Sequence, residues 1–71
     1  MASIHIGKKI QAVFKKSSIT MVDFTRKLDL TRQMGYDIFE RKNINTDLLL
    51  RISKILNHDF FEYYRRQFKI K

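Results

Sequence analysis

The sequence predicts an all-α fold, a compact bundle of five short helices in one domain. At 71 residues, the chain buries only roughly 60% of its unfolded surface, so a single small core is the economical solution. Proline is absent and there are only two glycines, so the strongest helix breakers are nearly missing. Apolar residues recur at intervals of three and four, which is typical of amphipathic helices. Without cysteine, apolar packing must hold the fold, because neither disulfides nor cysteine-ligated zinc are available.

Residues 4–16 are predicted to form the first helix. Four apolar residues have the i, i+4, i+7, i+8 spacing of one helical face: Ile6, Ile10, Val13 and Phe14. Four basic residues lie largely off that face: Lys8, Lys9, Lys15 and Lys16. Ser17 and Ser18 then form a short turn.

Two short helices follow, at about residues 20–29 and 31–41, separated by a turn of about two residues. Thr20 with Asp23 forms a start similar to a capping box, and Thr31 is suited to cap the next helix. Apolar residues bury one side of both helices: Phe24, Leu28, Leu30, Ile38 and Phe39. Four side chains of the second of these helices are left facing outward: Arg32, Gln33, Tyr36 and Asp37. This is the layout of a helix-turn-helix motif that reads DNA.

Two further helices complete the predicted bundle. Asn45 or Thr46 caps the fourth helix, whose apolar face is broad: Leu48, Leu49, Ile52, Ile55 and Leu56. Asp59 caps a short fifth helix, which carries three aromatic residues that close the bundle: Phe60, Phe61 and Tyr64. We expect the domain to span residues 1–64, and residues 65–71 to be a basic tail with no fold of its own.

The charge of the chain favours a polyanionic partner. Its formal net charge is +8 and its isoelectric point is about 10.1, which favours polyanions such as nucleic acid. No apolar run approaches the about 18 residues of a membrane-spanning helix, and the start MASIHIGKKI lacks the features of a secretory signal. We therefore expect a cytoplasmic protein of bacterial or phage type, associated with the nucleoid.

Three runs together resemble a known family: FTRKLDLTRQMGYDIFERK, INTDLLLRISKIL and NHDFFEYY. They are similar to the Cro and phage-repressor type of helix-turn-helix DNA-binding domain, often called XRE-like, over roughly residues 6–64. The resemblance implies a five-helix bundle whose third helix enters the major groove, with the fourth and fifth helices completing the core.

Three positions depart from that family's pattern. Phe24 and Thr25 stand where the family usually has leucine and alanine, so the threonine must fit a tight contact between the second and third helices. Gly35 occupies a position normally held by a buried valine or isoleucine, and we hypothesise that Phe24 fills the vacated space. Met21 stands where relatives often carry a phosphate-binding glutamine, so a polar side-chain contact from that position is excluded.

Four residues are the candidates for contact with DNA bases: Arg32, Gln33, Tyr36 and Asp37. A recognition helix presents its first turn, and positions one turn later, to the base edges. Arginine pairs bidentately with guanine, glutamine pairs bidentately with adenine, and aspartate accepts from cytosine N4.

Phosphate contacts require donors that flank the reading helix. The family geometry implies five candidates, at the start of the second helix, at the cap of the third and in the loop that follows it: Thr20, Thr31, Arg41, Lys42 and Asn43. Four basic residues of the tail are candidates for a second electrostatic anchor on the DNA backbone: Arg65, Arg66, Lys69 and Lys71. The alternative is that the tail is simply a solvated chain end.

Aromatic residues near the end of the chain suggest either core packing or base stacking, and we favour core packing. Tyr63 and Phe68 are left without cover at helical spacing. They are the candidates for a dimer surface, because domains of this type read two half-sites as a symmetric pair.

Catalysis and metal binding are not expected. His5 and His58 lack acidic or thiol partners at ligand spacing, so no metal site is predicted. Asp37 and Glu40 are more consistent with a solvated helix face than with an acid–base pair, and neither a phosphate-binding loop nor an activated nucleophile is recognisable. We therefore expect no enzymatic activity, no cofactor and no small-molecule ligand.

The sequence thus favours a transcriptional regulator that binds double-stranded DNA sequence-specifically, as a repressor-like homodimer. The alternative is an XRE-like protein-interaction module, such as an antitoxin or partner-binding regulator, with weak DNA contact. A basic amphipathic protein lying on anionic membranes through FFEYYRRQFKIK is a third, less favoured interpretation.

Overall fold

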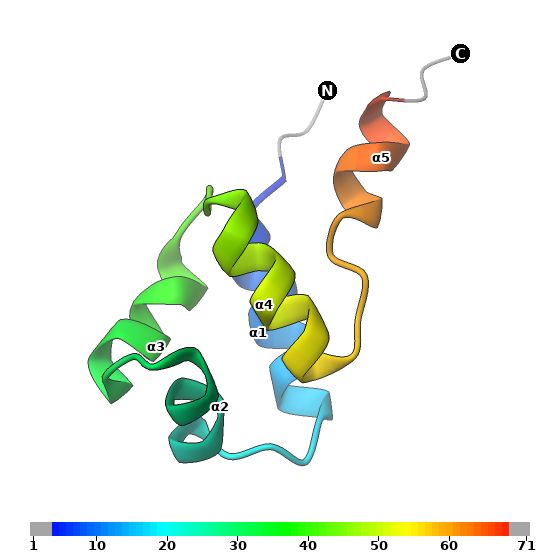
Figure 1. The fold of residues 1–71 in the computed structure, drawn as a ribbon. Coiled ribbons are helices and arrows are strands. Elements are labelled where there is room, and N and C mark those ends of the chain that lie inside the picture. Colours follow the sequence, from blue (N-terminus) through cyan, green and yellow to red (C-terminus); the bar gives the residue numbers. More distant parts are fainter. Residues whose placement is uncertain (1–3, 69–71) are drawn as a thin grey trace.

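Five α-helices make up most of residues 4–68, the part of the chain that the computed structural model describes (Figure 1). Their bounds are α1 Ile6–Lys16, α2 Met21–Leu28, α3 Arg32–Glu40, α4 Thr46–Leu56 and α5 Glu62–Phe68. No strand occurs within residues 4–68. The predicted all-α bundle of five short helices is confirmed.

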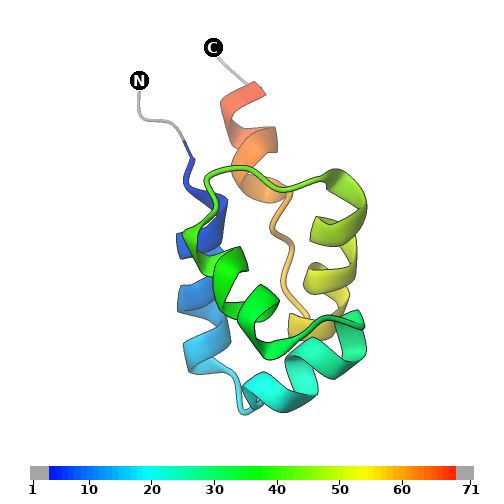
Figure 2. The same ribbon diagram turned by 90° about the vertical axis from the view of Figure 1, so that its left-hand side faces the viewer.

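The core lies where the first four helices meet. Figure 2 views the bundle from the side of α3, with α1 on the left, α4 on the right and α2 below. The ring of Phe14 lies 5.2 Å from that of Phe24 and 5.4 Å from that of Phe39, so α1, α2 and α3 share one aromatic cluster. Aliphatic residues surround it and are almost completely buried: Ile6, Ile10, Leu28, Ile38, Leu49 and Ile52.

Side-chain caps define most of the helix ends, because the usual glycine and proline signals are missing. Thr20, Thr31 and Asn45 each accept a hydrogen bond from the backbone N–H three residues on, as the sequence predicts. His5 does the same for α1 through Nδ1. The first helix therefore begins at Ile6, two residues later than predicted.

Two helices end on a residue in the left-handed conformation that glycine usually supplies. Asp29, after α2, has φ 60°, and Asn57, after α4, has φ 53°. Aspartate and asparagine tolerate this region better than other non-glycine residues. These two positions allow sharp reversals of the chain without glycine.

The fifth helix differs from the prediction at both ends. It begins at Glu62, so Phe60 and Phe61 precede it, and it continues through Phe68. Asp59 accepts a hydrogen bond from the N–H of Phe61, and its other oxygen pairs with Arg65 at 2.7 Å.

A second ion pair, of 2.9 Å, joins Glu62 to Arg66 one turn along the same helix. These two pairs extend the helix into the segment predicted to have no fold, so that prediction is wrong for residues 65–68. Lys69 and Lys71, predicted as part of the tail anchor, lie outside the described residues.

Backbone hydrogen bonds join the start of α1 to the segment that follows α3. The N–H of Gly7 donates to the carbonyl of Arg41 at 2.9 Å, and the N–H of Ile6 donates to that of Lys42 at 3.3 Å. A Cβ atom at Gly7 would lie 2.5 Å from the carbonyl oxygen of Ile38 and 2.6 Å from those of Phe39 and Arg41. No residue with a side chain therefore fits at position 7 without a shift of the backbone.

We expect Gly7→Ala to lower the free energy of unfolding by about 3 kcal/mol, the upper end of the usual cost of overpacking, because the obstructing atoms belong to the backbone. Urea denaturation measures this change. Ala12→Gly, at an exposed position of the same helix, serves as the control and should cost only about 1 kcal/mol. Equal losses in the two variants would mean that the close approach at Gly7 is not a constraint.

Candidate nucleic-acid interface

α2 and α3 are joined by three residues, Asp29, Leu30 and Thr31. Asp29 ends α2 in the left-handed conformation, and the N–H of Leu30 returns to the carbonyl of Thr25 at 2.9 Å. Thr31 then caps α3 through its hydroxyl oxygen, which accepts from the N–H of Met34 at 3.2 Å. The connection is tight, so the direction of α3 is set directly by α2 (Figure 1).

The outer face of α3 carries all four candidates for base contact. Gly35, Ile38 and Phe39 form the buried side of the helix, whereas the four candidates are exposed: Arg32, Gln33, Tyr36 and Asp37. Tyr36 is 55% exposed, and its ring stands edge-on against that of Phe39, at 6.4 Å between centroids. This contact orients the tyrosine without covering it.

The five candidates for phosphate contact flank this face in sequence. The hydroxyl oxygens of Thr20 and Thr31 accept capping hydrogen bonds, which leaves each O–H available to donate to another group. Three exposed side chains follow the last turn of α3: Arg41, Lys42 and Asn43. The carbonyls of Arg41 and Lys42 are held by α1, so the start of this segment is fixed relative to the helix.

Charge on the outer face of α3 is balanced. Arg32 in the helix and Arg41 directly after it are offset by Asp37 and Glu40, and all four side chains are exposed. The face therefore offers specific hydrogen-bonding groups with little net attraction for phosphate. Attraction for phosphate has to come from Lys42, which follows this face, and from residues elsewhere on the surface.

Met34 is an exposed apolar residue beside the candidate site that the sequence analysis missed. It is 49% exposed and lines a groove of about 300 Å³ on the α4 side of α3, with Leu30, Asp37, Ile38, Arg41, Asn45 and Leu48. The sequence could have indicated Met34, because it is an apolar residue one turn after the helix cap that does not share the face of the buried residues. It enlarges the surface that α3 offers to a ligand.

Thr25 and Gly35 fix the contact between α2 and α3. The Thr25 hydroxyl donates to the carbonyl of Met21 at 2.8 Å, and its methyl group occupies the place next to Gly35 where a Cβ atom would collide with it. The Met21 sulfur would lie 2.9 Å from the same Cβ. The vacated space is therefore filled by Thr25 and Met21, and the hypothesis that Phe24 fills it is wrong.

Phe24 lies instead in the aromatic cluster with Phe14 and Phe39. The predicted tight fit at Thr25 is confirmed, because its extra methyl group is matched by the missing side chain of Gly35.

Tyr63, which the sequence predicts to be uncovered, is partly covered by other residues. Its hydroxyl lies 3.1 Å from Nε2 of His58, its ring stacks on that of His58 at 6.0 Å, and the Lys9 ammonium lies 5.0 Å above the ring centre. Tyr63 therefore joins α5 to α1 and to the end of α4. Tyr64, predicted to close the bundle, is 38% exposed.

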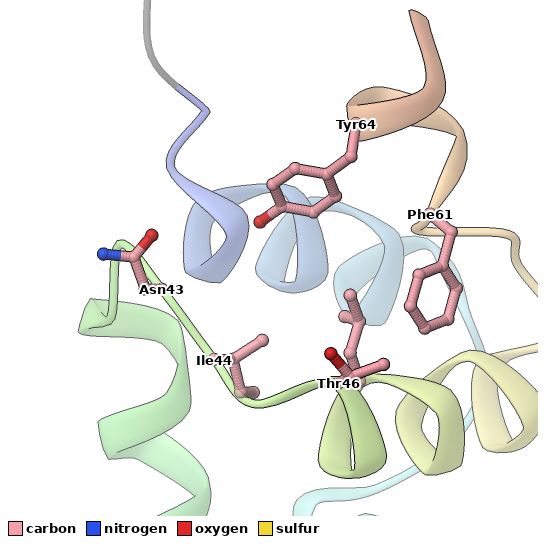
Figure 3. Close-up of a pocket in the computed structure, with 6 residues that line it drawn as sticks. Asn43, Ile44, Thr46, Phe61 and Tyr64 are labelled. Atoms are coloured by element: carbon pink, nitrogen blue, oxygen red, sulfur yellow. The ribbon is translucent and has the colours of Figure 1, made fainter. Parts of the chain in front are cut away.

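An aromatic stripe, Phe61, Tyr64 and Phe68, begins at the half-buried Phe61 just before α5 and continues along the helix. Phe68 is 86% and Tyr64 38% exposed, and partial burial raises the pKa of the Tyr64 hydroxyl. Phe61 and Tyr64 also line a pocket of about 360 Å³ (Figure 3), together with Asn43, Ile44, Thr46 and Leu49. The predicted exposure of Phe68 is confirmed.

The basic residues of α5 do not lie with those of α3. Figure 1 shows α5 on the opposite side of the bundle from α3. Arg65 and Arg66 are paired with Asp59 and Glu62, and the hydrogen bond from Arg65 lowers the pKa of the Asp59 carboxyl. Their charges are therefore largely offset within the helix and its cap.

Within residues 4–68, no group of three or more histidine, aspartate or glutamate side chains is placed to hold a metal ion. None of the helices in this part of the chain is long and apolar enough to cross a membrane. No family model matches the chain, and no curated protein or solved structure matches it either. Function therefore has to be inferred from the geometry and charge of this surface.

Because Thr25 and Gly35 are complementary in size, we expect the effect of Gly35→Ala on the free energy of unfolding to change sign when Thr25 is shortened. In the native background, we expect Gly35→Ala to lower the free energy of unfolding by about 1 kcal/mol, because overpacking outweighs the gain in helix propensity. In a Thr25→Ala background, only the flexible Met21 side chain still has to shift, so the same change should raise it, by at most about 1 kcal/mol. Chemical denaturation of the four proteins gives the coupling energy, and additive effects would mean that Thr25 does not restrict this site.

Proposed function

We propose that the protein is a transcriptional regulator of the Cro and phage-repressor (XRE-like) type, which binds double-stranded DNA sequence-specifically and represses by occupying a promoter. The observation that carries the proposal is the outer face of α3, where Arg32, Gln33, Tyr36 and Asp37 are exposed together. An exposed helix that follows a tight turn, with polar side chains on its first turns, is suited to the major groove.

Each of these side chains has a definite part in base recognition. Arg32 donates to O6 and N7 of guanine, and Gln33 pairs with N6 and N7 of adenine, each bidentate pair giving about 1–3 kcal/mol of discrimination. Asp37 accepts from N4 of cytosine. Tyr36, braced by Phe39, offers both a hydroxyl and an apolar ring edge to the same groove.

The phosphate contacts set the register of the helix on the duplex. Thr20 and Thr31 donate through their hydroxyl hydrogens at the starts of α2 and α3. The segment after α3 supplies the longer donors: Arg41, Lys42 and Asn43. Because the backbone of this segment is tied to α1, these donors hold α3 at a fixed depth in the groove.

Selection from random double-stranded DNA with the purified protein, at two salt concentrations, tests the proposal directly. A recovered sequence motif would support it, and two half-sites about one helical turn apart would add that a symmetric dimer binds. Retention of DNA without any motif, lost at the higher salt, would mean that charge binds the DNA while α3 does not read it.

Two single substitutions separate base reading from backbone contact. We expect Arg32→Ala to relax the preference at one or two base pairs of the selected site, with a loss of about 1–3 kcal/mol there. Lys42→Ala should weaken all sequences similarly and make the salt dependence shallower by about one phosphate contact. Fluorescence anisotropy on the selected site and on single-base variants measures both, and uniform losses in both variants would contradict the assignment of α3.

A protein-interaction module, such as an antitoxin or a partner-binding regulator, is the second candidate function. It is favoured by the balanced charge on the outer face of α3 and by the exposed Met34 beside the adjacent groove. The two functions differ in salt dependence. DNA binding weakens steeply with salt, by a slope of about −0.9 per phosphate contact, whereas a partner complex held by apolar contacts does not.

The aromatic stripe on α5 is the surface that we assign to a homodimer. Helix α5 lies on the opposite side of the bundle from α3, and Phe68 is the most exposed residue of the stripe, whereas Phe61 and Tyr64 also face Asn43 across a pocket. Two copies joined through the Phe68 end of α5 would keep both reading helices free. Dimers of this kind read two half-sites on the same duplex.

We expect Phe68→Glu to shift the protein from dimer to monomer, because two carboxylates would be brought together in an apolar contact. Sedimentation equilibrium measures the shift. Phe68→Leu, which keeps an apolar side chain, is the matched control and should remain more dimeric than Phe68→Glu. The same mass for the native protein and for Phe68→Glu would place any interface elsewhere.

A further inference from the structure

The positive charge of this protein is concentrated on α1, away from the reading helix. Residues 4–68 carry thirteen basic and seven acidic side chains, a net charge of +6. Helix α1 has four lysines and no acidic residue, so it holds four of these six net charges. By contrast, the outer face of α3 is neutral.

The four lysines form a regular surface. Lys8 and Lys15 are seven residues apart, as are Lys9 and Lys16, so each pair is aligned along the helix at a rise of about 10.5 Å. The two rows lie on either side of Ala12, and all five residues are exposed. We call this surface the α1 lysine face.

Local interactions do not neutralise the α1 lysine face. The ion pairs found within residues 4–68 involve Arg26, Arg65 and Arg66, and none involves α1. Lys9 lies over the ring of Tyr63, and this contact leaves its charge unpaired. Four like charges on eleven residues repel one another, so a bound polyanion would reduce the electrostatic repulsion within the helix.

The α1 lysine face does not point in the direction of the outer face of α3. It lies opposite the buried residues Ile6 and Ile10 of the same helix, and α3 packs on α1 through Gly7 and Phe14. In Figure 2, α3 faces the viewer and α1 lies along the left edge. A straight duplex lying on α3 would leave the α1 lysine face uncovered.

The chemistry of the face fits the DNA backbone better than a membrane. Lysine binds phosphate as a point charge without requiring a fixed geometry, and the small side chain of Ala12 between the rows allows close approach. A helix that lies in a membrane surface needs large apolar side chains beside its lysines. The only side chain between these rows is a methyl group, so nothing is present to insert among lipid chains.

We propose that the α1 lysine face binds the phosphate backbone of a second DNA segment, independently of sequence, while α3 occupies the first. One molecule then contacts two duplex segments. The proposal rests on the function proposed above only for the identity of the first segment. It assigns to α1 the sequence-independent attraction that the neutral face of α3 lacks.

The test compares two triple variants of equal charge. Lys8→Gln/Lys15→Gln/Lys16→Gln removes three charges from the face and keeps the contact of Lys9 with Tyr63. Lys27→Gln/Arg51→Gln/Lys54→Gln, at exposed positions of α2 and α4, removes the same charge elsewhere. Glutamine and lysine have similar helix propensity, so circular dichroism should report the same fold for both.

Affinity for a duplex without the selected site is measured at 50 and 200 mM salt. For the α1 variant, we expect the salt dependence to be shallower by about three contacts, so that its loss of affinity between the two salts is about 40-fold smaller than that of the native protein. The control variant should keep the native slope. Equal slopes in the two variants would overturn the proposal, because only net charge would then matter.

A capture experiment tests for the second segment. Protein bound to an immobilised operator duplex should retain a labelled duplex without the operator, and the α1 variant should lose this retention while still binding the operator. Retention by both triple variants alike would also overturn the proposal. Failure of the proposed function has a different signature: the selection yields no motif, yet the α1 variant still loses binding to any duplex that the control variant retains.

Discussion

The start of α1 rests directly on the carboxyl end of α3, and the rest of the bundle is arranged around this contact. The first N–H groups of a helix and its last carbonyls have no partners within the helix. Here the N–H groups of Ile6 and Gly7 donate to the carbonyls that follow α3, so two helix ends satisfy each other's unpaired groups, and their dipoles attract. Such an approach leaves no room for a side chain, which is why Gly7 is a glycine. It also fixes where the chain leaves α3, and therefore where α4 begins.

The second constraint on α3 is its contact with α2, where Thr25 and Gly35 are complementary in size. A threonine on one helix occupies the volume that the missing side chain leaves on the other, and the threonine hydroxyl is satisfied by the carbonyl of Met21 within its own helix. Gly35 costs about 1 kcal/mol of helix propensity relative to alanine, and the close packing of α2 on α3 offsets this cost. With one glycine contact at its end and another in its middle, α3 has a fixed rotation about its own axis. That rotation decides which of its side chains are exposed.

Features set by interactions within a few residues could be predicted from the sequence, whereas features set by tertiary contacts could not. The caps at Thr20, Thr31 and Asn45 follow from side-chain chemistry within four residues, and the exposed face of α3 follows from its period, so both could be predicted. The role of Gly7 could not, because its obstruction comes from carbonyls more than thirty residues away in sequence. The start of α5 differs from the prediction for a local reason, since the Asp59 side chain accepts from the N–H of Phe61 and the helix begins only at Glu62. The partial cover of Tyr63 could not be predicted, because it comes from His58 and from Lys9 of α1.

If α3 reads bases as proposed, α3 carries the specificity, whereas much of the sequence-independent affinity comes from α1. Phosphate contacts supply most of the sequence-independent free energy of binding, whereas base contacts discriminate among sequences. A neutral reading face weakens binding to any duplex it does not match, because a wrong base leaves its arginines and acids without compensating partners. The lysines of α1 bind every sequence equally and add nothing to discrimination. Separating the two on different sides of a 71-residue domain therefore keeps a strongly basic protein selective, since the charge that attracts DNA does not hold α3 on the wrong site.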